Sequence, residues 1–426
     1  MTATTMPIET PALVAAGSRP RIMSPALALV FLASFGSLTS FYLLLSVVPL
    51  YATSVGAGGT GAGFATGALM LSTVAAELAS PRLIARFGYR PMLAAGLVLL
   101  GAPALAFPLS SSLVAILAVC AVRGLGFAII MVVGGALIAS LLPAERRGEG
   151  LGLYGLVAGV PSVAALPLGV WLAGRVGYPV VFVAGAVAAL AGLAAVPGLR
   201  GHGGAGDPHA SAADRGAGAD RGAGAERPIG VLAGLATPAL LRPALVFAAT
   251  TIAGGVVVTF LPLAVTHVSG GLVAIALLVQ SAAATVTRWW AGRYGDRHGS
   301  AGLLAPAVLV AGTGMLLLAV TGSPIAVIAG MLLFGTGFGV AQNATLSVML
   351  ERVPASGYGT VSAVWNLAYD AGYGVGAAGF GLVAAYTGQP AGFAITGLLV
   401  LAALRVARRR PSPTIMTFPP DTPGAS

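Results

Sequence analysis

The sequence predicts an all-α membrane protein with twelve transmembrane helices in two six-helix, pseudo-symmetric bundles. Of its 426 residues, 57% are hydrophobic and 8% are charged, against roughly 25% charged in soluble domains. A chain of this composition has too little polar surface to cover a soluble core of its size, so lipid is the expected solvent. Twelve long apolar runs, and a repeat of the first six in the last six, predict the rest of the architecture.

The first apolar run, Ala26–Leu50, is uncharged and long enough to cross about 30 Å of hydrocarbon as a helix. The residues before it hold scattered prolines and no apolar core of signal-peptide form, so we expect a retained span. Strands are a poor alternative because the runs do not alternate apolar and polar residues. The further expected spans are Gly61–Ser80, Met92–Leu109, Ser112–Leu142, Leu151–Ala173, Tyr178–Leu199, Ala244–Thr266, Gly270–Ala291, Leu303–Val320, Pro324–Leu350, Ser356–Thr387 and Gly392–Leu404.

The arginines predict the orientation, since the chain contains no lysine. If the amino terminus is cytoplasmic, the inner segments hold nearly all of them, Arg288 included. Only Arg175 then falls in an outer loop, and Arg123 lies within a span. By the positive-inside rule we expect a multi-pass protein of the plasma membrane with both termini in the cytoplasm.

Between the sixth and seventh spans, Gly198–Leu241 is rich in Gly, Ala, Asp and Arg and nearly repeats itself at Asp214 and Asp220. This composition predicts a flexible cytoplasmic linker, with a substrate- or nucleotide-binding loop as the alternative. The expected organisation is a cytoplasmic tail (1–23), a first bundle (24–197), the linker (198–241), a second bundle (242–408) and a second cytoplasmic tail (409–426).

The two halves share sequence at one offset. Arg123-Gly124-Leu125-Gly126-Phe127 matches Phe334-Gly335-Thr336-Gly337-Phe338, an offset of 334 − 123 = 211. The same offset aligns Gly88 with Gly299, Pro143 with Pro354, Tyr154 with Trp365, Pro179 with Pro390 and Phe182 with Phe393. Several separated regions in one register predict two homologous bundles with a solute route between them.

The segment Gly292-Arg293-Tyr294-Gly295-Asp296-Arg297-His298-Gly299 lies between two apolar runs. Its glycines permit a sharp reversal there, and its charges keep the reversal in water. The segment resembles the signature loop of the major facilitator superfamily, Gly-x-x-x-Asp-Arg-x-Gly, which links the second and third helices of each half. With the repeat, the resemblance covers about Pro25–Arg408 and implies a secondary transporter similar to the family's bacterial efflux permeases.

The first-half copy of this loop has Ala85 where the family usually has Asp. The resemblance implies that Asp296 holds one side shut by engaging the amino terminus of the fifth span, near Arg146 and Arg147. Alternatively, Asp296 only pairs with the arginines next to it and sets the turn. The expected gating residues are Gly292, Asp296, Arg297, Gly299, Arg86 and Gly88.

Charges inside the spans are the guide to mechanism, because a mid-span charge costs about 2.5–3.5 kcal/mol and normally faces a cavity and a partner. Asp370 shares a helical face with Asn366 and Tyr373, and we expect it to take up protons or contact the ligand, with a packing role as the alternative. Arg123 matches the basic residue that the family places in its fourth helix, whereas Glu77 is expected to be structural. The expected proton and substrate cavity comprises Arg123, Asp370, Asn366, Tyr369, Tyr373, Trp365, Gln342, Asn343 and Tyr42.

The sequence therefore predicts transport of a small organic solute by alternating access, with proton-coupled efflux preferred. Proton-coupled uptake and a transport-inactive receptor or scaffold are the alternatives. An enzyme is not expected, since the four histidines form no cluster at lipid depth, and without lysine the chain has no phosphate-binding ATPase motif. The expected partners are the solute, protons and the bilayer. We expect a functional monomer with no cofactor, no metal and no nucleic-acid partner.

Overall fold

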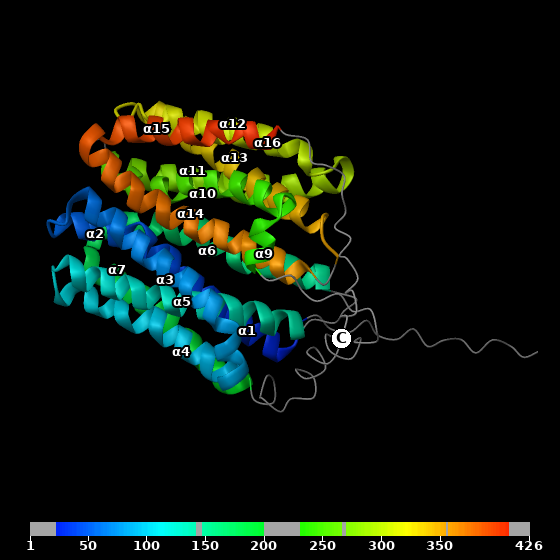
Figure 1. The fold of residues 1–426 in the computed structure, drawn as a ribbon. Coiled ribbons are helices and arrows are strands. Elements are labelled where there is room, and N and C mark those ends of the chain that lie inside the picture. The colour runs from blue at the N-terminus through cyan, green and yellow to red at the C-terminus, as the bar shows by residue number, and fades with distance from the viewer. Residues whose placement is uncertain (1–22, 142–146, 200–230, 266–269, 355–356, 409–426) are drawn as a thin grey trace, which may run out of the picture.

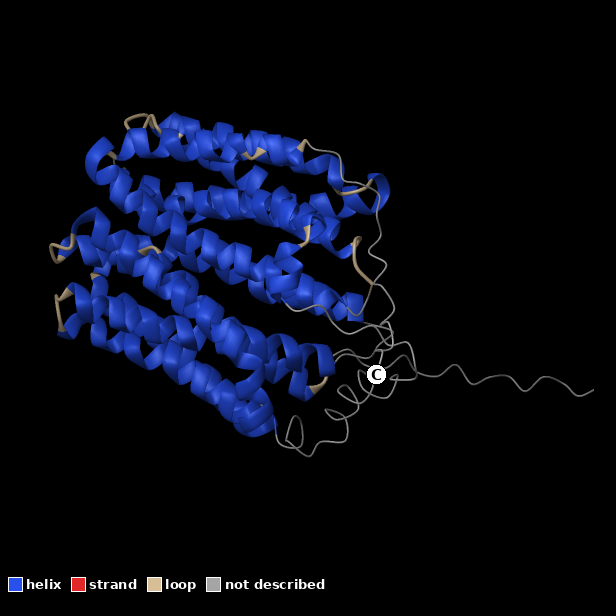
Figure 2. Cartoon of the chain, viewed as in Figure 1, coloured by secondary structure: helices blue, strands red, loops and turns tan. Residues whose placement is uncertain are grey.

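The computed structural model describes residues 23–141, 147–199, 231–265, 270–354 and 357–408. Helices joined by short turns make up these ranges, and no strand occurs within them (Figures 1 and 2). The expected all-α fold is confirmed. Both tails and residues 200–230 of the expected linker lie outside the described ranges.

The first group of helices corresponds to the first six expected spans. Its members are α1 (Pro25–Leu45), α2 (Val47–Ser54), α3 (Gly58–Phe87), α4 (Tyr89–Gly101), η1 (Ala102–Leu109), α5 (Leu113–Leu141), α6 (Arg147–Val176), α7 (Tyr178–Ala191) and η3 (Gly192–Leu199). The second group corresponds to the last six. Its members are α9 (Val231–Ala236), α10 (Pro238–Ala264), α11 (Gly270–His298), η4 (Ala301–Leu303), α12 (Leu304–Leu317), α13 (Pro324–Leu350), α14 (Tyr358–Thr387), α15 (Gln389–Ala402) and α16 (Leu404–Ala407).

Ten helices in the described ranges are long and apolar enough to cross a membrane. The segment Ala301–Leu317 is a shorter apolar helix, and α14 spans 30 residues but carries Trp365, Asn366 and Asp370 in its middle. With these two, every expected span corresponds to a helix. The protein is a multi-pass membrane protein.

The repeat is visible in the turns. Gly88 and Gly299 both have positive φ, at 79° and 83°, and so do Gly177 and Gly388, at 84° and 78°. Each pair is separated by 211 residues, the offset that the sequence predicts. Glycine serves at these four turns because other residues pay a steric cost at positive φ.

The expected reversal over Gly292–Gly299 is wrong in its extent. Helix α11 continues through His298, and the chain turns only at Gly299, just as α3 continues to Phe87 and turns at Gly88. Gly292 and Gly295 face nearby side chains, those of Asn343 and Ser300, so they serve close packing inside the helix rather than a turn.

Part of the range expected as linker is helical. Helix α9 and the first residues of α10, up to Leu241, fall within 198–241. Leu199 and Leu240 are fully buried there. Apolar packing thus begins well before the expected start of the second bundle, because Val231–Leu241 is more apolar than the Gly- and Asp-rich stretch before it.

The two groups pack side by side (Figure 1). We call the end where α1 begins and α16 stops the terminal end, and the opposite end the far end. Hydrogen bonds tie the groups together toward the far end. The Ser46 hydroxyl donates to the Val258 carbonyl at 2.8 Å, and the hydroxyls of Thr66 and Thr259 lie 3.0 Å apart.

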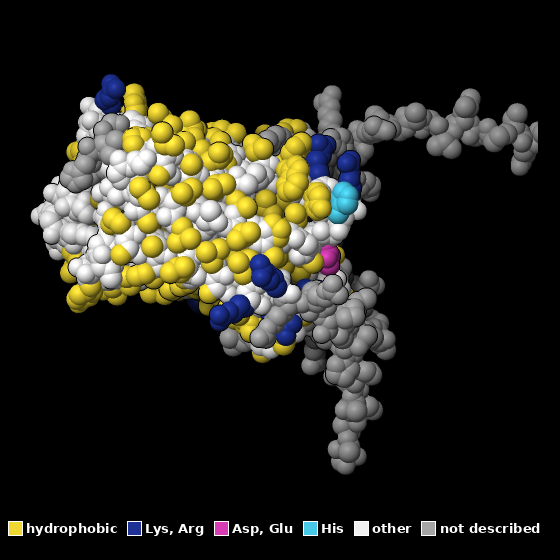
Figure 3. Space-filling view, turned by 90° about the horizontal axis from the view of Figure 1, so that it is seen from above, with side chains coloured by type: hydrophobic (Ala, Val, Ile, Leu, Met, Phe, Trp, Pro, Cys, Tyr) yellow, Lys and Arg dark blue, Asp and Glu magenta, His cyan; other side chains and the backbone are white. Residues whose placement is uncertain are grey.

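The outer surface suits lipid. In Figure 3 hydrophobic side chains cover most of the visible face, and arginine and histidine side chains gather mainly toward one end. On α11 the exposed rings of Trp289 and Trp290 are followed by exposed Arg293, whose guanidinium lies 4.3 Å from the centre of the Trp289 ring. Tryptophan beside arginine is typical of the membrane–water interface.

We predict that Gly299→Ala lowers the free energy of unfolding by about 1–2 kcal/mol, because alanine is strained at positive φ. A Cβ at Gly299 would meet no atom within 4 Å, and the same holds for Gly302, whose φ is not positive. Gly302→Ala is therefore the matched control and should be close to neutral. A fluorogenic maleimide that reacts with the single, buried Cys120 as the protein unfolds measures both variants. Equal stabilities would contradict the prediction.

Candidate functional site

A cavity of about 60 Å³ lies between the two groups of helices. Helices α1 and α6 of the first group and α10, α11, α13 and α14 of the second contribute to its wall. The lining is a mixture of aromatic, hydroxyl and amide side chains with one arginine. The lining residues are Tyr42, Leu45, Ser162, Leu166, Val258, Gln280, Ser281, Ala284, Thr285, Arg288, Phe338, Gln342, Tyr369 and Tyr373.

Four residues that the sequence assigned to a cavity lie in this wall: Tyr42, Gln342, Tyr369 and Tyr373. Tyr369 and Tyr373 are one turn apart on α14, so their rings stack with centroids 4.9 Å apart. The Tyr42 side chain reaches across from α1 toward the Tyr369 side chain at the same wall. The tyrosines thus join the two halves at the cavity wall.

Asp370 lies beside these tyrosines, with 6% of its surface exposed. Its carboxyl group forms a hydrogen bond with that of Glu77, which α3 brings from the other half of the protein. A hydrogen bond between two carboxyl groups needs a proton on one of them, since ionised carboxylates only accept. Such a pair can hold one exchangeable proton at the contact between the halves.

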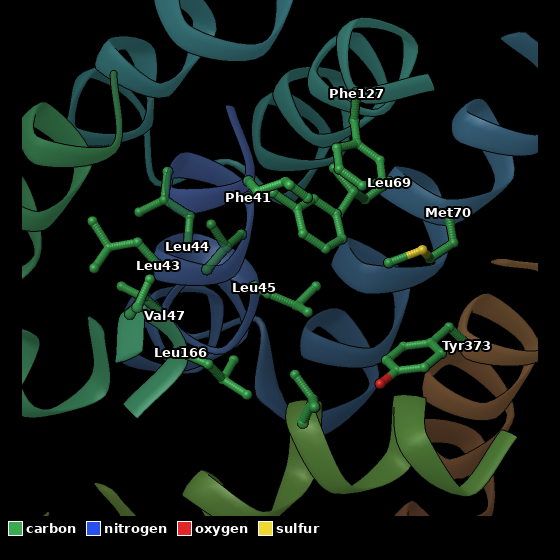
Figure 4. Close-up of a cluster of buried hydrophobic side chains, with 14 of the residues drawn as sticks. Phe41, Leu43, Leu44, Leu45, Val47, Leu69, Met70, Phe127, Leu166 and Tyr373 are labelled. Atoms are coloured by element: carbon green, nitrogen blue, oxygen red, sulfur yellow. The ribbon is translucent and has the colours of Figure 1, made fainter. Parts of the chain in front are cut away.

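The contact between α3 and α14 is close because small residues line it. In Figure 4 the Met70 side chain of α3 lies near the Tyr373 ring of α14. A Cβ on Gly374 would come within 2.9 Å of the Met70 Cβ. The helices approach at Gly374, one turn beyond Asp370, so a short aspartate can reach Glu77.

Arg123 lies elsewhere, inside the first bundle, and is 2% exposed. Its guanidinium donates to the Leu100 carbonyl at 2.9 Å and to the Ser40 carbonyl at 3.5 Å. Leu100 lies in the last turn of α4, just before the chain continues as η1, and its carbonyl accepts this bond. Arg123 therefore ties α5 to α4 and α1, and it does not line the cavity between the halves.

The expected helical face of Asn366, Asp370 and Tyr373 is divided in the structure, because Asn366 is exposed whereas the other two are buried. Trp365 stacks on Phe247, with ring centroids 4.5 Å apart, and donates to the Thr345 hydroxyl at 3.2 Å.

Asn343, also expected at the cavity, accepts from the Ser347 hydroxyl at 3.5 Å, a bond at the long end of the hydrogen-bond range. Asp370, Trp365, Asn366 and Asn343, all expected at the cavity, are not among the residues that line it.

The expected gating residues lie at the terminal end. Asp296, Arg297 and Arg86 are exposed there, and the Arg86 guanidinium lies 5.3 Å from the centre of the Phe87 ring. Asp296 is expected to engage the start of the fifth span, near Arg146 and Arg147. Arg146 falls outside the described residues.

Sequence reasoning missed the arginine of the cavity. Arg288 was assigned to the inner arginines by the charge rule, but α11 carries it to the cavity wall, half-buried, with Gln280, Ser281 and Thr285 on the same helix. Its place inside the apolar run Gly270–Ala291 was the available signal. Within the described ranges, His, Cys, Asp and Glu side chains do not gather into groups that could hold a metal ion.

Comparison with known proteins identifies relatives of the whole architecture. Residues 30–377 match the Major Facilitator Superfamily. A chloramphenicol resistance protein of Streptomyces lividans is 31% identical over 391 residues, which cover 87% of this chain and 92% of the relative.

Two solved structures share the fold. The crystal structure of a D-xylose–proton symporter has a TM-score of 0.70 at 14% identity, over 90% of this chain and 97% of the other. A peptide transporter POT in complex with sulfate has a TM-score of 0.69 at 18% identity, over 90% and 93%.

We predict that Arg123→Ala destabilises the protein by about 2–4 kcal/mol, because it leaves buried carbonyls without their donor and opens a void. The exposed Arg405 provides the control, and Arg405→Ala should change stability by less than about 0.5 kcal/mol. Thermal unfolding in detergent, followed by circular dichroism, measures both. An Arg123→Ala protein as stable as the control would show that these hydrogen bonds do not hold the bundle together.

Proposed function

Because the chain belongs to the Major Facilitator Superfamily, we propose that it is a secondary transporter that exports a small organic solute from the cytoplasm in exchange for protons. The observation that carries this proposal is the hydrogen bond between Asp370 and Glu77 at the contact between the halves, next to the cavity. Asp370 is the protonation site in this scheme, and Glu77 shares its proton. The chloramphenicol resistance protein that resembles this chain over most of its length supports export as the direction.

The proposed coupling follows from electrostatics. With one proton present, the two carboxyl groups hold α3 against α14, and with none they repel each other. The same helices meet again at the far end, where the Thr60 hydroxyl donates to the Gly381 carbonyl at 3.2 Å. Loss of the proton therefore loosens the whole contact and favours opening at the far end.

This sequence of events gives antiport. The proton leaves toward the terminal end when the solute binds from that side, the far end opens, and the solute is released there. Uptake of a new proton from the far side closes the contact again.

The hydroxyls of Tyr42, Tyr369 and Tyr373 are the other titratable groups near Asp370. Asp296 is proposed as a latch that engages the start of α6 when the terminal end closes.

The proposed orientation places the terminal end in the cytoplasm of a cell with a plasma membrane energised by protons. Arginines support it, since exposed Arg82, Arg86, Arg293, Arg297 and Arg405 lie at that end. At the far end Arg175 is exposed beside Trp171, 5.3 Å from its ring centre.

We predict that Asp370→Asn abolishes proton-driven transport but leaves exchange of solute across the membrane without a pH gradient. The asparagine cannot lose a proton, so the contact no longer responds to pH. Proteoliposomes with chloramphenicol as the probe measure both activities, with a pH-sensitive dye for the protons.

The matched control is Glu351→Gln, an exposed acid just beyond α13, which should behave as wild type. Solute-dependent proton movement that persists in Asp370→Asn would reject the proposed site. Protons moving with the solute rather than against it would identify an uptake symporter.

We predict that a cysteine at Arg405 reacts with a membrane-impermeant maleimide only from the cytoplasmic side, and one at Arg175 only from the outside. Both arginines are exposed, at opposite ends of the molecule. A Cys120→Ser background removes the single native thiol. Inside-out and right-side-out vesicles give the two readings, and the reverse pattern would invert the proposed direction.

A further inference from the structure

The two repeats carry opposite charges at one equivalent position. Glu77 on α3 and Arg288 on α11 are 211 residues apart, the offset of the repeat. Each helix contacts a helix of the other half, α3 with α14 and α11 with α6. Asp370, the partner of Glu77 on α14, corresponds in the same register to Gly159 on α6. At the contact of α3 with α14, Glu77 thus meets the acid Asp370. At the equivalent contact of α11 with α6, the residue opposite the Arg288 position is Gly159.

Among the residues that line the cavity, none carries a charge opposite to that of Arg288. Within the described ranges Arg288 forms no ion pair. On α6, a Cβ at Gly155 would meet nothing within 4 Å, and one at Gly159 would first meet Thr285 at 3.7 Å. By contrast, buried Arg123 is stabilised locally by hydrogen bonds to backbone carbonyls. A half-buried cation in a protein normally has a partner.

The surroundings of Arg288 suit an aromatic molecule. The rings of Tyr42, Phe338, Tyr369 and Tyr373 line the same cavity. The Gln280 and Gln342 amides add donors that do not carry charge. Apolar faces with a few convergent donors are typical of sites for small organic ligands.

We propose that Arg288 binds the carboxylate of an aromatic carboxylate solute in the cavity between the halves. This assignment rests on the proposed transport function and names its substrate class. The planar guanidinium matches a carboxylate with two parallel hydrogen bonds. The ring of the solute lies against the tyrosines, and the open side of α6 leaves space for it. At about 60 Å³ the cavity holds only part of such a solute, since pockets for drug-sized ligands measure about 300–1,000 Å³, so the halves part further to admit it.

The test compares two ligands that differ only in charge. Binding of radiolabelled 4-nitrobenzoate to the purified full-length protein is measured by scintillation proximity, with unlabelled 4-nitrobenzoate and neutral 4-nitrobenzamide as competitors. We expect the carboxylate to displace the label at a concentration at least about tenfold lower than the amide needs. The reason is that loss of one charge-assisted interaction costs about 1.4 kcal/mol or more. Arg288→Gln should remove this preference and Arg288→Lys should keep part of it, because lysine retains the charge but not the paired geometry.

The control variant is Arg405→Gln, an exposed arginine at the terminal end that should bind as wild type. Absence of 4-nitrobenzoate binding, equal competition by the amide, or an unchanged preference in folded Arg288→Gln would each overturn the proposal. Proton exchange with 4-nitrobenzoate, and in parallel with chloramphenicol, is measured separately in proteoliposomes. If that exchange persists while the carboxylate preference is absent, only the substrate assignment fails. If the preference holds and neither solute exchanges for protons, only the proton-coupled function fails.

Discussion

The hydrogen bond between Asp370 and Glu77 is the interaction on which the proposed cycle depends. Hydrocarbon cannot form hydrogen bonds with a carboxyl group, so each acid within a span needs a partner in the protein. Here the partner is another acid from the opposite half, and in the proposed cycle the pair holds together only while it keeps a proton. The same constraint acts on Arg123, but its partners are carbonyls of its own bundle. The Asp370–Glu77 pair can therefore respond to protons, whereas Arg123 stabilises the fold of its own bundle.

Small residues make this pairing possible. Gly63 and Gly67 of α3 face Ala377 and Ala378 of α14, so close that an added Cβ at either glycine would press on the other helix. Helices in membranes associate mainly through such close packing. Close packing also couples this pair to the rest of the interface. Because the backbones of α3 and α14 touch along their length, a change at Asp370 shifts the two helices relative to each other.

Much of the fold follows from the sequence, because the length and hydrophobicity of a span are local properties. The turns at Gly88 and Gly299 were predictable from the repeat, but the helix between Gly292 and His298 was not. Glycines there suggested a reversal, whereas they fit against Asn343 and Ser300. The candidate site was harder to predict. Tyr42 and Tyr369 were found from their polarity within apolar runs, but the contact between Glu77 and Asp370 joins residues 293 positions apart (370 − 77) and exists only in the folded bundle.

The repeat keeps its turns and changes its charges. Gly177 and Gly388 adopt nearly the same φ, so the two halves share this turn, while their side chains differ at the contacts between the halves. At equivalent positions the chain has Glu77 and Arg288, and opposite them Asp370 and Gly159. A transporter with identical halves would have identical contacts on both sides of the cavity. In the proposed cycle a proton closes one contact and the other is left open beside a cation, so ion and solute act on different pairs of helices. Each can then bias the same rocking motion without occupying the other's place.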